Sequence, residues 1–310
     1  MAYGFADIPQ AERDLIAADK PRLIGRNWGR TATTLRWDAD GDLTAGADVA
    51  DASFPSKRIK DDQSYLVTKP SGSAVESPPG TWNRYFAYDF GSEGMEIDAV
   101  ALLKHNLGTL TGVTVDIRVA DNAAFVTNNR IIETFTPGSS NKRLVSVSLE
   151  HGGGIAQRYT TVRYLMIHLK KGADFTPEFG EFIIGRSRQF KHTLKIPYAR
   201  RRLRSRWSDF EAASGAGRRY GFHKNRRPIT GSINPSETAY IDDLETLFKT
   251  ETDGGKLPIL WVEKPGTAPS DAWWVRYMNP DLQLTNVDFT EHEVPLDFLE
   301  VGPDFLAAET

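Results

Sequence analysis

The sequence predicts a mainly β protein, and three observations support this fold class. Short apolar segments recur at regular spacing, with turn-forming residues between them. Several segments alternate, as in residues 113–119, where every odd position is a branched aliphatic residue. Such alternation is typical of an antiparallel sheet with one buried face. The chain also contains 26 Gly and 17 Pro, which suits a structure rich in turns.

The composition limits the class of protein further. A chain of 310 residues is long enough for two domains, and 40% hydrophobic with 25% charged residues is ordinary for a globular protein. The absence of cysteine excludes disulfides and thiolate metal sites. No apolar run approaches the roughly 20 residues that cross a bilayer, and the first ten residues lack a secretory pattern. We therefore expect synthesis in a cytoplasm and no membrane insertion.

The first 22 residues are expected to form an N-terminal arm. Residues Ala11–Lys20 have a short helical pattern that ends at Pro21. Two interpretations stay open: the arm packs on a neighbouring subunit, or it is a frayed helix on the surface.

Residues 23–185 are expected to form a β-sandwich of the jelly-roll type. Turns dominate up to Lys69, and Ser71–Gly80 is expected to be a loop. Two segments then stand out: a Trp- and Tyr-bearing strand that ends in Asp-Phe-Gly, at residues 82–91, and an apolar strand that ends in His-Asn-Leu, at residues 96–107. The strands expected from here on are Tyr85–Phe90, Ile97–Leu103, Val113–Val119, Arg130–Phe135, Leu144–Leu149, Tyr164–His168 and Phe179–Ile184.

Residues 186–310 are expected to form a second domain, a β-barrel or sandwich with one α-helix at 236–252. Ser236 can cap this helix, and Gly254-Gly255 can end it. Its apolar positions fall on one face, at Tyr240, Leu244, Leu247 and Phe248. The expected strands are Phe190–Pro197, Arg200–Trp207, a hairpin of Tyr220–Phe222 with Arg227–Ile233, Leu257–Glu263, Trp273–Met278, and a closing hairpin of Leu282–Phe289 with His292–Val301.

Charge is strongly segregated within this second domain. Residues 186–227 contain 14 Lys and Arg but two acids, whereas residues 228–310 contain 16 acids but four Lys and Arg. A chain with such complementary regions can associate with copies of itself.

The first domain resembles the discoidin-like, galactose-binding-like jelly roll. The resemblance rests on Trp82, on Tyr88–Gly91, on Ile97–Leu102 and on His105-Asn106-Leu107, followed by the strand at 113–119. Similar domains occur in tail-tip and baseplate proteins of bacteriophages. The second domain is similar to the distal tail family, through its basic strand-rich segment, its single helix and the strand at Leu257–Trp261.

This resemblance implies a structural component of a phage tail tip, of the distal tail or baseplate type. It would assemble as a homo-oligomeric ring, a hexamer or trimer, and join the tail tube to tip or fibre proteins in the virion tail. For contacts between subunits we select Arg200, Arg202, Arg204 and Arg206, which share one face of an extended strand. Pairing with the acidic region is favoured, and contact with nucleic acid passing through a tube stays an alternative.

Trp273 and Trp274 are the remaining interface candidates. In an alternating strand one of them faces the core, and the other faces out and can anchor an interface. A core-plus-edge placement of the pair is the competing interpretation.

The alternative function is a carbohydrate-binding module that contacts host surface glycans. Trp82 and Arg84, with Trp28 and Trp37, could supply a stacking surface and hydrogen bonds. A third hypothesis, an enzyme acting on glycans or peptidoglycan, has no motif behind it. His151-Gly152-Gly153-Gly154 imitates an oxyanion loop, but the chain lacks the matching G-x-S-x-G nucleophile pentapeptide. We therefore predict that the protein is not an enzyme and has no catalytic residues.

We also predict no cofactor and no metal. The segment Asp38–Asp42 resembles the start of a calcium loop, but its glycine falls too early, and Val49 stands where the bidentate glutamate belongs. A tight turn is the preferred interpretation. Because discoidin-like domains sometimes hold a structural calcium, the resemblance keeps calcium as a minor alternative. The six histidines have no metal-ligand spacing.

Overall fold

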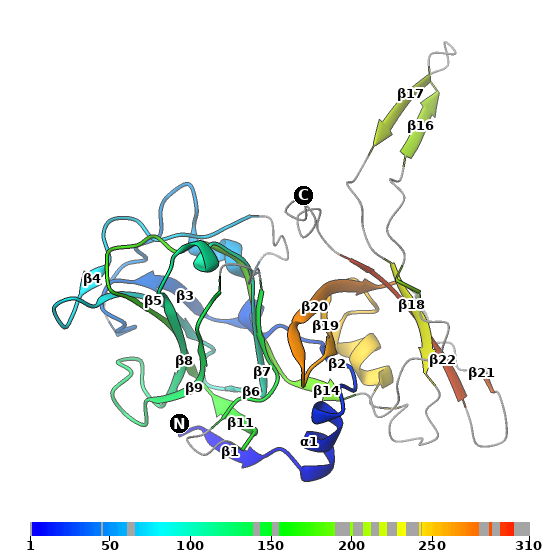
Figure 1. The fold of residues 1–310 in the computed structure, drawn as a ribbon, viewed down its shortest axis with the longest axis horizontal. Coiled ribbons are helices and arrows are strands. Elements are labelled where there is room, and N and C mark those ends of the chain that lie inside the picture. Colours follow the sequence, from blue (N-terminus) through cyan, green and yellow to red (C-terminus); the bar gives the residue numbers. More distant parts are fainter. Residues whose placement is uncertain are drawn as a thin grey trace. The chain divides into compact units, whose positions relative to one another are not determined.

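A computed structural model of the chain describes residues 2–44, 46–60, 66–138, 143–150, 155–189, 199–200, 207–211, 217–221, 228–233, 242, 244–278, 285–286 and 292–300. Figure 1 shows its ribbon. The chain divides into two compact units, residues 1–190 with 260–272, and residues 191–259 with 273–310. Residues 260–272, which were expected in the second domain, belong to the first unit. Every helix in the described part of the chain is too short for a transmembrane span.

The first unit is built on a β-sandwich, which confirms the mainly β fold class. One layer is a six-stranded antiparallel sheet in the order β3-β5-β12-β8-β9, with β4 paired to β5. The other layer contains a three-stranded sheet in the order β10-β7-β13. The strands of the six-stranded sheet are β3 (Thr34–Asp38), β4 (Val75–Glu76), β5 (Trp82–Asp89), β8 (Thr114–Ala120), β9 (Arg130–Phe135) and β12 (Tyr164–Lys171). Those of the smaller sheet are β7 (Ala99–His105), β10 (Arg143–Ser146) and β13 (Phe179–Gly185).

Alternation along the strands builds the core between these layers. In β8 the side chains of Val115, Ile117 and Val119 are buried in the core, as the sequence pattern predicts. Asp116 points to the opposite face and is nevertheless only 1% exposed. Its carboxylate is paired with the Lys170 ammonium at 2.6 Å and accepts a hydrogen bond from the Thr134 hydroxyl at 3.0 Å. Asp116, a polar residue on the outer face of the sheet, is thus buried beneath the side chains of Lys170 and Thr134 that bind it.

The N-terminal segment packs on the chain's own sandwich. Strand β1 (Gly4–Asp7) pairs with β11 (Gln157–Val162), which pairs in turn with β6 (Met95–Ile97). Helix α1 (Gln10–Ala17) follows, and Ile8 between β1 and α1 is fully buried. The predicted arm is therefore not a free extension in this structure, because its backbone completes a sheet of the same chain. Neither β1 nor β11 was predicted from the sequence.

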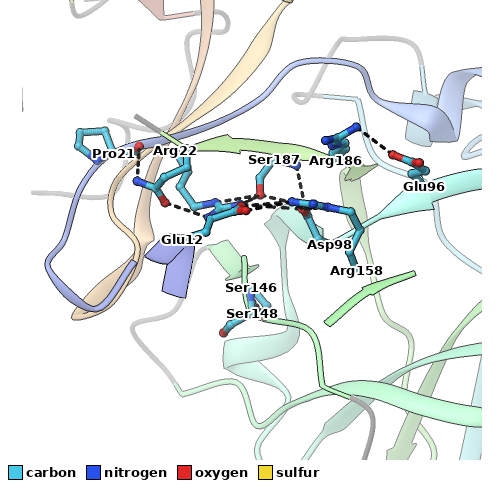
Figure 2. A network of polar contacts seen from close by, with 11 residues as sticks. Glu12, Pro21, Arg22, Glu96, Asp98, Ser146, Ser148, Arg158, Arg186 and Ser187 are labelled. Atoms are coloured by element: carbon cyan, nitrogen blue, oxygen red, sulfur yellow. Dashed lines mark hydrogen bonds and ion pairs between the residues drawn. The ribbon is translucent and has the colours of Figure 1, made fainter. Parts of the chain in front are cut away.

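A network of charged and polar side chains fastens this segment to the body of the unit (Figure 2). Arg22, in β2 (Arg22–Ile24), is fully buried and donates from Nη2 to Glu12 in α1 at 2.7 Å, and from Nε to the Ser187 hydroxyl at 2.8 Å. Asp98 accepts from the backbone N–H of Ser187 at 2.6 Å and from Arg158 Nε at 3.0 Å. Two arginines and two carboxylates thus neutralise one another beneath α1.

Residues 260–272 join the first unit through the N-terminal segment. Strand β2 pairs on one side with β14 (Ser187–Gln189) and on the other with β19 (Ile259–Lys264). The turn after β19 is fastened by Asp19, which follows α1. Asp19 accepts backbone N–H groups of Gly266 at 3.0 Å and Thr267 at 2.9 Å, and the Thr267 hydroxyl at 2.6 Å. Three segments far apart in the sequence therefore lie side by side as neighbouring strands of one sheet.

Among the described residues of the second unit, strand β22 (His292–Glu300) pairs with three other strands. They are β18 (Pro228–Ile233), β20 (Ala268–Tyr277), whose residues from Trp273 onward belong to this unit, and β21 (Thr285–Asn286). Strand β15 (Ala199–Arg200) pairs with β18. Strands β16 (Trp207–Glu211) and β17 (Gly217–Gly221) pair with each other. The predicted hairpin of 220–222 with 227–233 is therefore wrong, because β18 forms a six-residue register with the long strand β22 instead.

The predicted helix at 236–252 is present in its C-terminal half. Asp242 and residues 244–246 are helical, and Leu247–Glu251 continue as a π-helical turn. Residues 236–241 and 243, including the expected cap at Ser236, lie outside the described residues. Leu244, Leu247 and Phe248 are buried, as the pattern predicts. Gly254 and Gly255 end the segment with φ angles of 65° and 84°, a conformation that favours glycine.

Candidate functional site

Three loops meet at one end of the sandwich, which we call the loop end. They are residues 71–74 before β4, residues 106–110 after β7, and residues 172–178 between β12 and β13. The strand register brings them together, because Trp82 at the start of β5 pairs with Lys171 at the end of β12. In the other layer, His105 at the end of β7 pairs with Phe179 at the start of β13.

Arg84 ties two of these loops together from below. It lies in β5 and is only 5% exposed. Its guanidinium donates to the backbone carbonyls of Ser71 at 3.2 Å, of Gly72, and of Phe175 at 3.3 Å. A charged group this deeply buried requires several hydrogen bonds, and the loop carbonyls supply them. The guanidinium thereby fixes where both loops run.

Asp174 and Asn106 complete the connections between the loops. One oxygen of Asp174 accepts the backbone N–H groups of Ala74 and Phe175, each at 2.8 Å. The side-chain amide of Asn106 donates to the carbonyl of Thr176 at 3.0 Å and accepts from the N–H of Glu178 at 2.9 Å. The loops at 71–74 and 172–178 are therefore each held by a side chain from another segment, and the loop at 106–110 supplies the Asn106 side chain that holds 172–178.

The outer surface of the loop end is polar, with one aromatic residue at its base. Ser71, Gly72, Ser73 and Thr176 are exposed. Trp82 is partly buried and packs against the sandwich core. Such a surface offers hydroxyl and backbone groups for hydrogen bonds beside part of an indole ring, the combination suited to polyhydroxylated ligands.

The carboxylate of Asp174 is the main charged group of this surface. Its side chain is 42% exposed. The hydrogen bond from the Ala74 amide, followed by those from Ser73 and Phe175, lowers the pKa of Asp174 below its ordinary value. The group is therefore ionised at neutral pH, and a carboxylate exposed to this extent can accept hydrogen bonds from ligand hydroxyls.

The structure separates the residues that the sequence grouped as a stacking surface. Trp37 is a core residue whose indole N–H donates to the Thr68 hydroxyl at 2.9 Å. Trp28 lies in a 3-10 turn, with the Arg26 guanidinium 3.9 Å above its ring. Trp82 lies at the loop end. The Arg84 guanidinium donates to three backbone carbonyls and supports the loops, and its contact with a glycan stays a prediction.

The predicted interface residues fall in the second unit. Arg200 lies in β15, and Arg202, Arg204 and Arg206 lie outside the described residues. Trp273 and Trp274 lie in β20 and are only 5% and 1% exposed. The expectation that one of this pair faces outward is therefore corrected, because both side chains are buried.

The calcium alternative does not fit the turn at Asp38–Asp42. Oδ1 of Asp38 accepts backbone N–H groups from Asp40, Gly41 and Asp42 at 3.0–3.2 Å, and Oδ2 is bound by Arg36 at 2.8 Å. Both oxygens are thus engaged within the turn, as a tight Asx-type turn requires. In the part of the chain that the structure describes, no three His, Cys, Asp or Glu side chains gather as a metal site.

Two residues of the loop end were missed as site residues. Asn106 belongs to the His-Asn-Leu motif, which marks a strand end and carries part of the family resemblance, so its position was available as a signal. Asp174 follows Gly172-Ala173 in a loop with no motif. Its importance depends on the proximity of Ala74, a hundred residues earlier in the chain.

Comparison with known proteins shows a distant structural likeness to carbohydrate-binding jelly-roll domains over about half of the chain. The lectin domain of lectinolysin, solved as a His 62 mutant with Lewis b, has 14% identity and a TM-score of 0.34, covering 53% of this chain and 98% of that one. A fucose binding module of Streptococcus pneumoniae has 12% identity and a TM-score of 0.32, covering 52% and 94%. A family 31 glycoside hydrolase of Clostridium perfringens contains a CBM32-1 domain with 14% identity and a TM-score of 0.28, covering 51% and 99%.

No protein-family model matches this chain, and no curated protein matches it significantly. The TM-scores of these structural matches are 0.34 or lower. They are too low to transfer a ligand or a binding residue from those domains to this chain.

Proposed function

We propose that the protein is a non-catalytic binding protein whose sandwich recognises carbohydrate at the loop end. The observation that carries the proposal is the set of three loops held in place by Arg84, Asp174 and Asn106, with Trp82 at their base. Loops that are ordered before binding lose little conformational entropy when a ligand arrives. A polar rim beside an indole suits the alternating hydroxyl and C–H faces of a sugar.

A glycan array with the purified full-length protein tests this function. We expect binding to a defined subset of glycans, and for Trp82→Ala we expect affinity to fall about tenfold, or about 1.4 kcal/mol. Trp28→Ala is the matched control, since that indole is also partly buried and packs against the same core. Circular dichroism would verify that both variants fold. Absence of binding by the wild type, or equal affinity of both variants, would refute the proposal.

A second candidate function is a structural role in a phage tail tip, with self-assembly into a ring in the virion tail. The charge segregation of residues 186–227 and 228–310 favours it, because one copy then complements the next. The hairpin of β16 and β17 favours it too, since a two-stranded sheet is marginally stable without further packing. Tube, tip and fibre proteins would be the remaining partners.

Light scattering coupled to size-exclusion chromatography tests this second function. We expect a trimer or hexamer at low salt that dissociates as salt screens the charges. Replacing Arg200, Arg202, Arg204 and Arg206 by Glu should give a monomer at low salt, whereas Arg13→Glu and Arg163→Glu in the first unit should leave the oligomer intact. A wild type that stays monomeric at high concentration would contradict ring assembly.

A further inference from the structure

We propose that Arg84 is a built-in cation of the loop end, performing the task for which a divalent metal ion is used elsewhere. The loops should therefore hold their arrangement without any metal ion. The corollary that ligand binding is independent of metal rests on the proposed function; the claim about the loops does not.

The oxygen atoms around the guanidinium are of the kind that hard cations bind. Three backbone carbonyls converge on it, those of Ser71, Gly72 and Phe175. The carboxylate of Asp174 lies 3.9 Å from Nη2. Carbonyl and carboxylate oxygens gathered from separate loops are also the usual ligands of calcium. Without a positive charge at their centre, these oxygens would repel one another around a position that is itself only 5% exposed.

The guanidinium is held in place by the sheet below it. Arg84 lies between Trp82 and Phe86 on the core-facing side of β5, and Phe86 is fully buried in the sandwich core. Burial lowers the pKa of Arg84, and the Asp174 carboxylate opposes this effect. An arginine remains charged at neutral pH even so. The positive charge is thus permanent and attached to a rigid strand.

Asp174 binds backbone N–H groups of the same two loops that Arg84 binds through their carbonyls. While the Arg84 fork binds the carbonyls of Ser71, Gly72 and Phe175, Asp174 binds the N–H groups of Ala74 and Phe175. The pair therefore engages donors and acceptors of the same two loops. In other proteins a bound metal ion and its ligands hold loops together in this way. Here the Arg84 guanidinium takes the place of the ion.

Hydrogen exchange of the wild-type protein tests the metal independence directly. The probes are the amides of Ala74 and Phe175, measured with EDTA and then with millimolar calcium chloride. We expect identical protection and an identical melting temperature in both buffers. Loss of protection at these amides in EDTA, or a rise in melting temperature with calcium, would overturn the proposal.

Variants of Arg84 test the role of the side chain. We expect Arg84→Met to raise exchange at Ala74 and Phe175 about tenfold or more relative to core amides of β12, because the loop opens locally. Arg84→Lys keeps the charge without the planar fork and should restore part of the protection. The matched control is Arg163→Met, which removes an arginine from a more exposed pair with Asp89. Protection at the two amides that is unchanged in Arg84→Met would refute the role.

The outcomes also separate this inference from the proposed function. If Arg84→Met unfolds globally, the exchange of the wild type in EDTA and calcium still decides the question. If no glycan binds but the loop amides behave as expected, the proposed function fails and the role of Arg84 stands. If a glycan binds only when calcium is present and the loop amides lose protection in EDTA, the inference fails and the function stands.

Discussion

At the scale of single residues, the chain buries ionisable groups in two different ways. Arg84 and Asp116 remain charged because several partners surround them. His105 and His168 are instead held neutral. Burial lowers the pKa of each ring to about 4, and for His168 the neighbouring Arg118 and Lys170 add to the effect. Both ring nitrogens of His105 are buried without a hydrogen-bond partner among the described residues.

These histidines predict an acid-sensitive fold. Their folded pKa of about 4 lies below the ordinary value of 6.5, so the unfolded chain binds more protons between these two values. The free energy of unfolding should therefore be complete above pH 6.5 and fall as the pH drops toward 4, by up to about 1.4 kcal/mol per pH unit for each ring.

Urea denaturation at several pH values measures this slope. His105→Leu and His168→Gln should each flatten it, and the double variant should flatten it further. Stability that depends on pH equally in the wild type and in all three variants would contradict the assignment.

At the scale of elements, the network around Arg22 determines where the N-terminal segment packs. It joins α1, β2 and β14 to strands of the sandwich, through Glu12, Ser187 and Asp98 (Figure 2). The sequence pattern correctly indicated a short helix near residues 11–20. It could not indicate what that helix packs against, because its anchor, Arg158, lies far along the chain.

Loss of Arg22 should therefore be costly. Arg22→Met leaves the fully buried Asp98 with less compensation, and removal of one partner from a buried ion pair typically destabilises by about 3–5 kcal/mol. Arg13→Met, which removes a half-buried arginine of the same helix, is the matched control and should change stability by less than about 0.5 kcal/mol. Chemical denaturation measures both variants. Equal stabilities would show that the network contributes nothing.

At the scale of the whole molecule, the first unit is discontinuous in sequence. Residues 260–272 belong to it, since β19 pairs with β2 and Asp19 fastens the turn that follows. The expected boundary between residues 185 and 186 followed the change in composition along the chain. A change in composition cannot reveal a later segment that returns to complete an earlier sheet.

A fragment comparison tests this organisation. A fragment of residues 1–190 leaves one edge of β2 without its partner strand, and it exposes the fully buried Leu23 and Ile24. We expect it to melt at a lower temperature than the same fragment joined through a flexible linker to residues 259–272. Thermal unfolding followed by circular dichroism provides the comparison. Equal melting temperatures would mean that the returning segment is not part of the folding unit.

The sequence by itself determined the fold class and the positions of most sandwich strands. Those features depend on local alternation, which any window of a few residues contains, as in β8. Tertiary structure alone decided which polar residues form the loop end. Arg84 has the same place in the alternation as its apolar neighbours Phe86 and Tyr88, and only the loops at Ser71 and Phe175 make it a buried cation. Such a role depends on contacts between distant segments, and these form only once the two layers of the sandwich have packed.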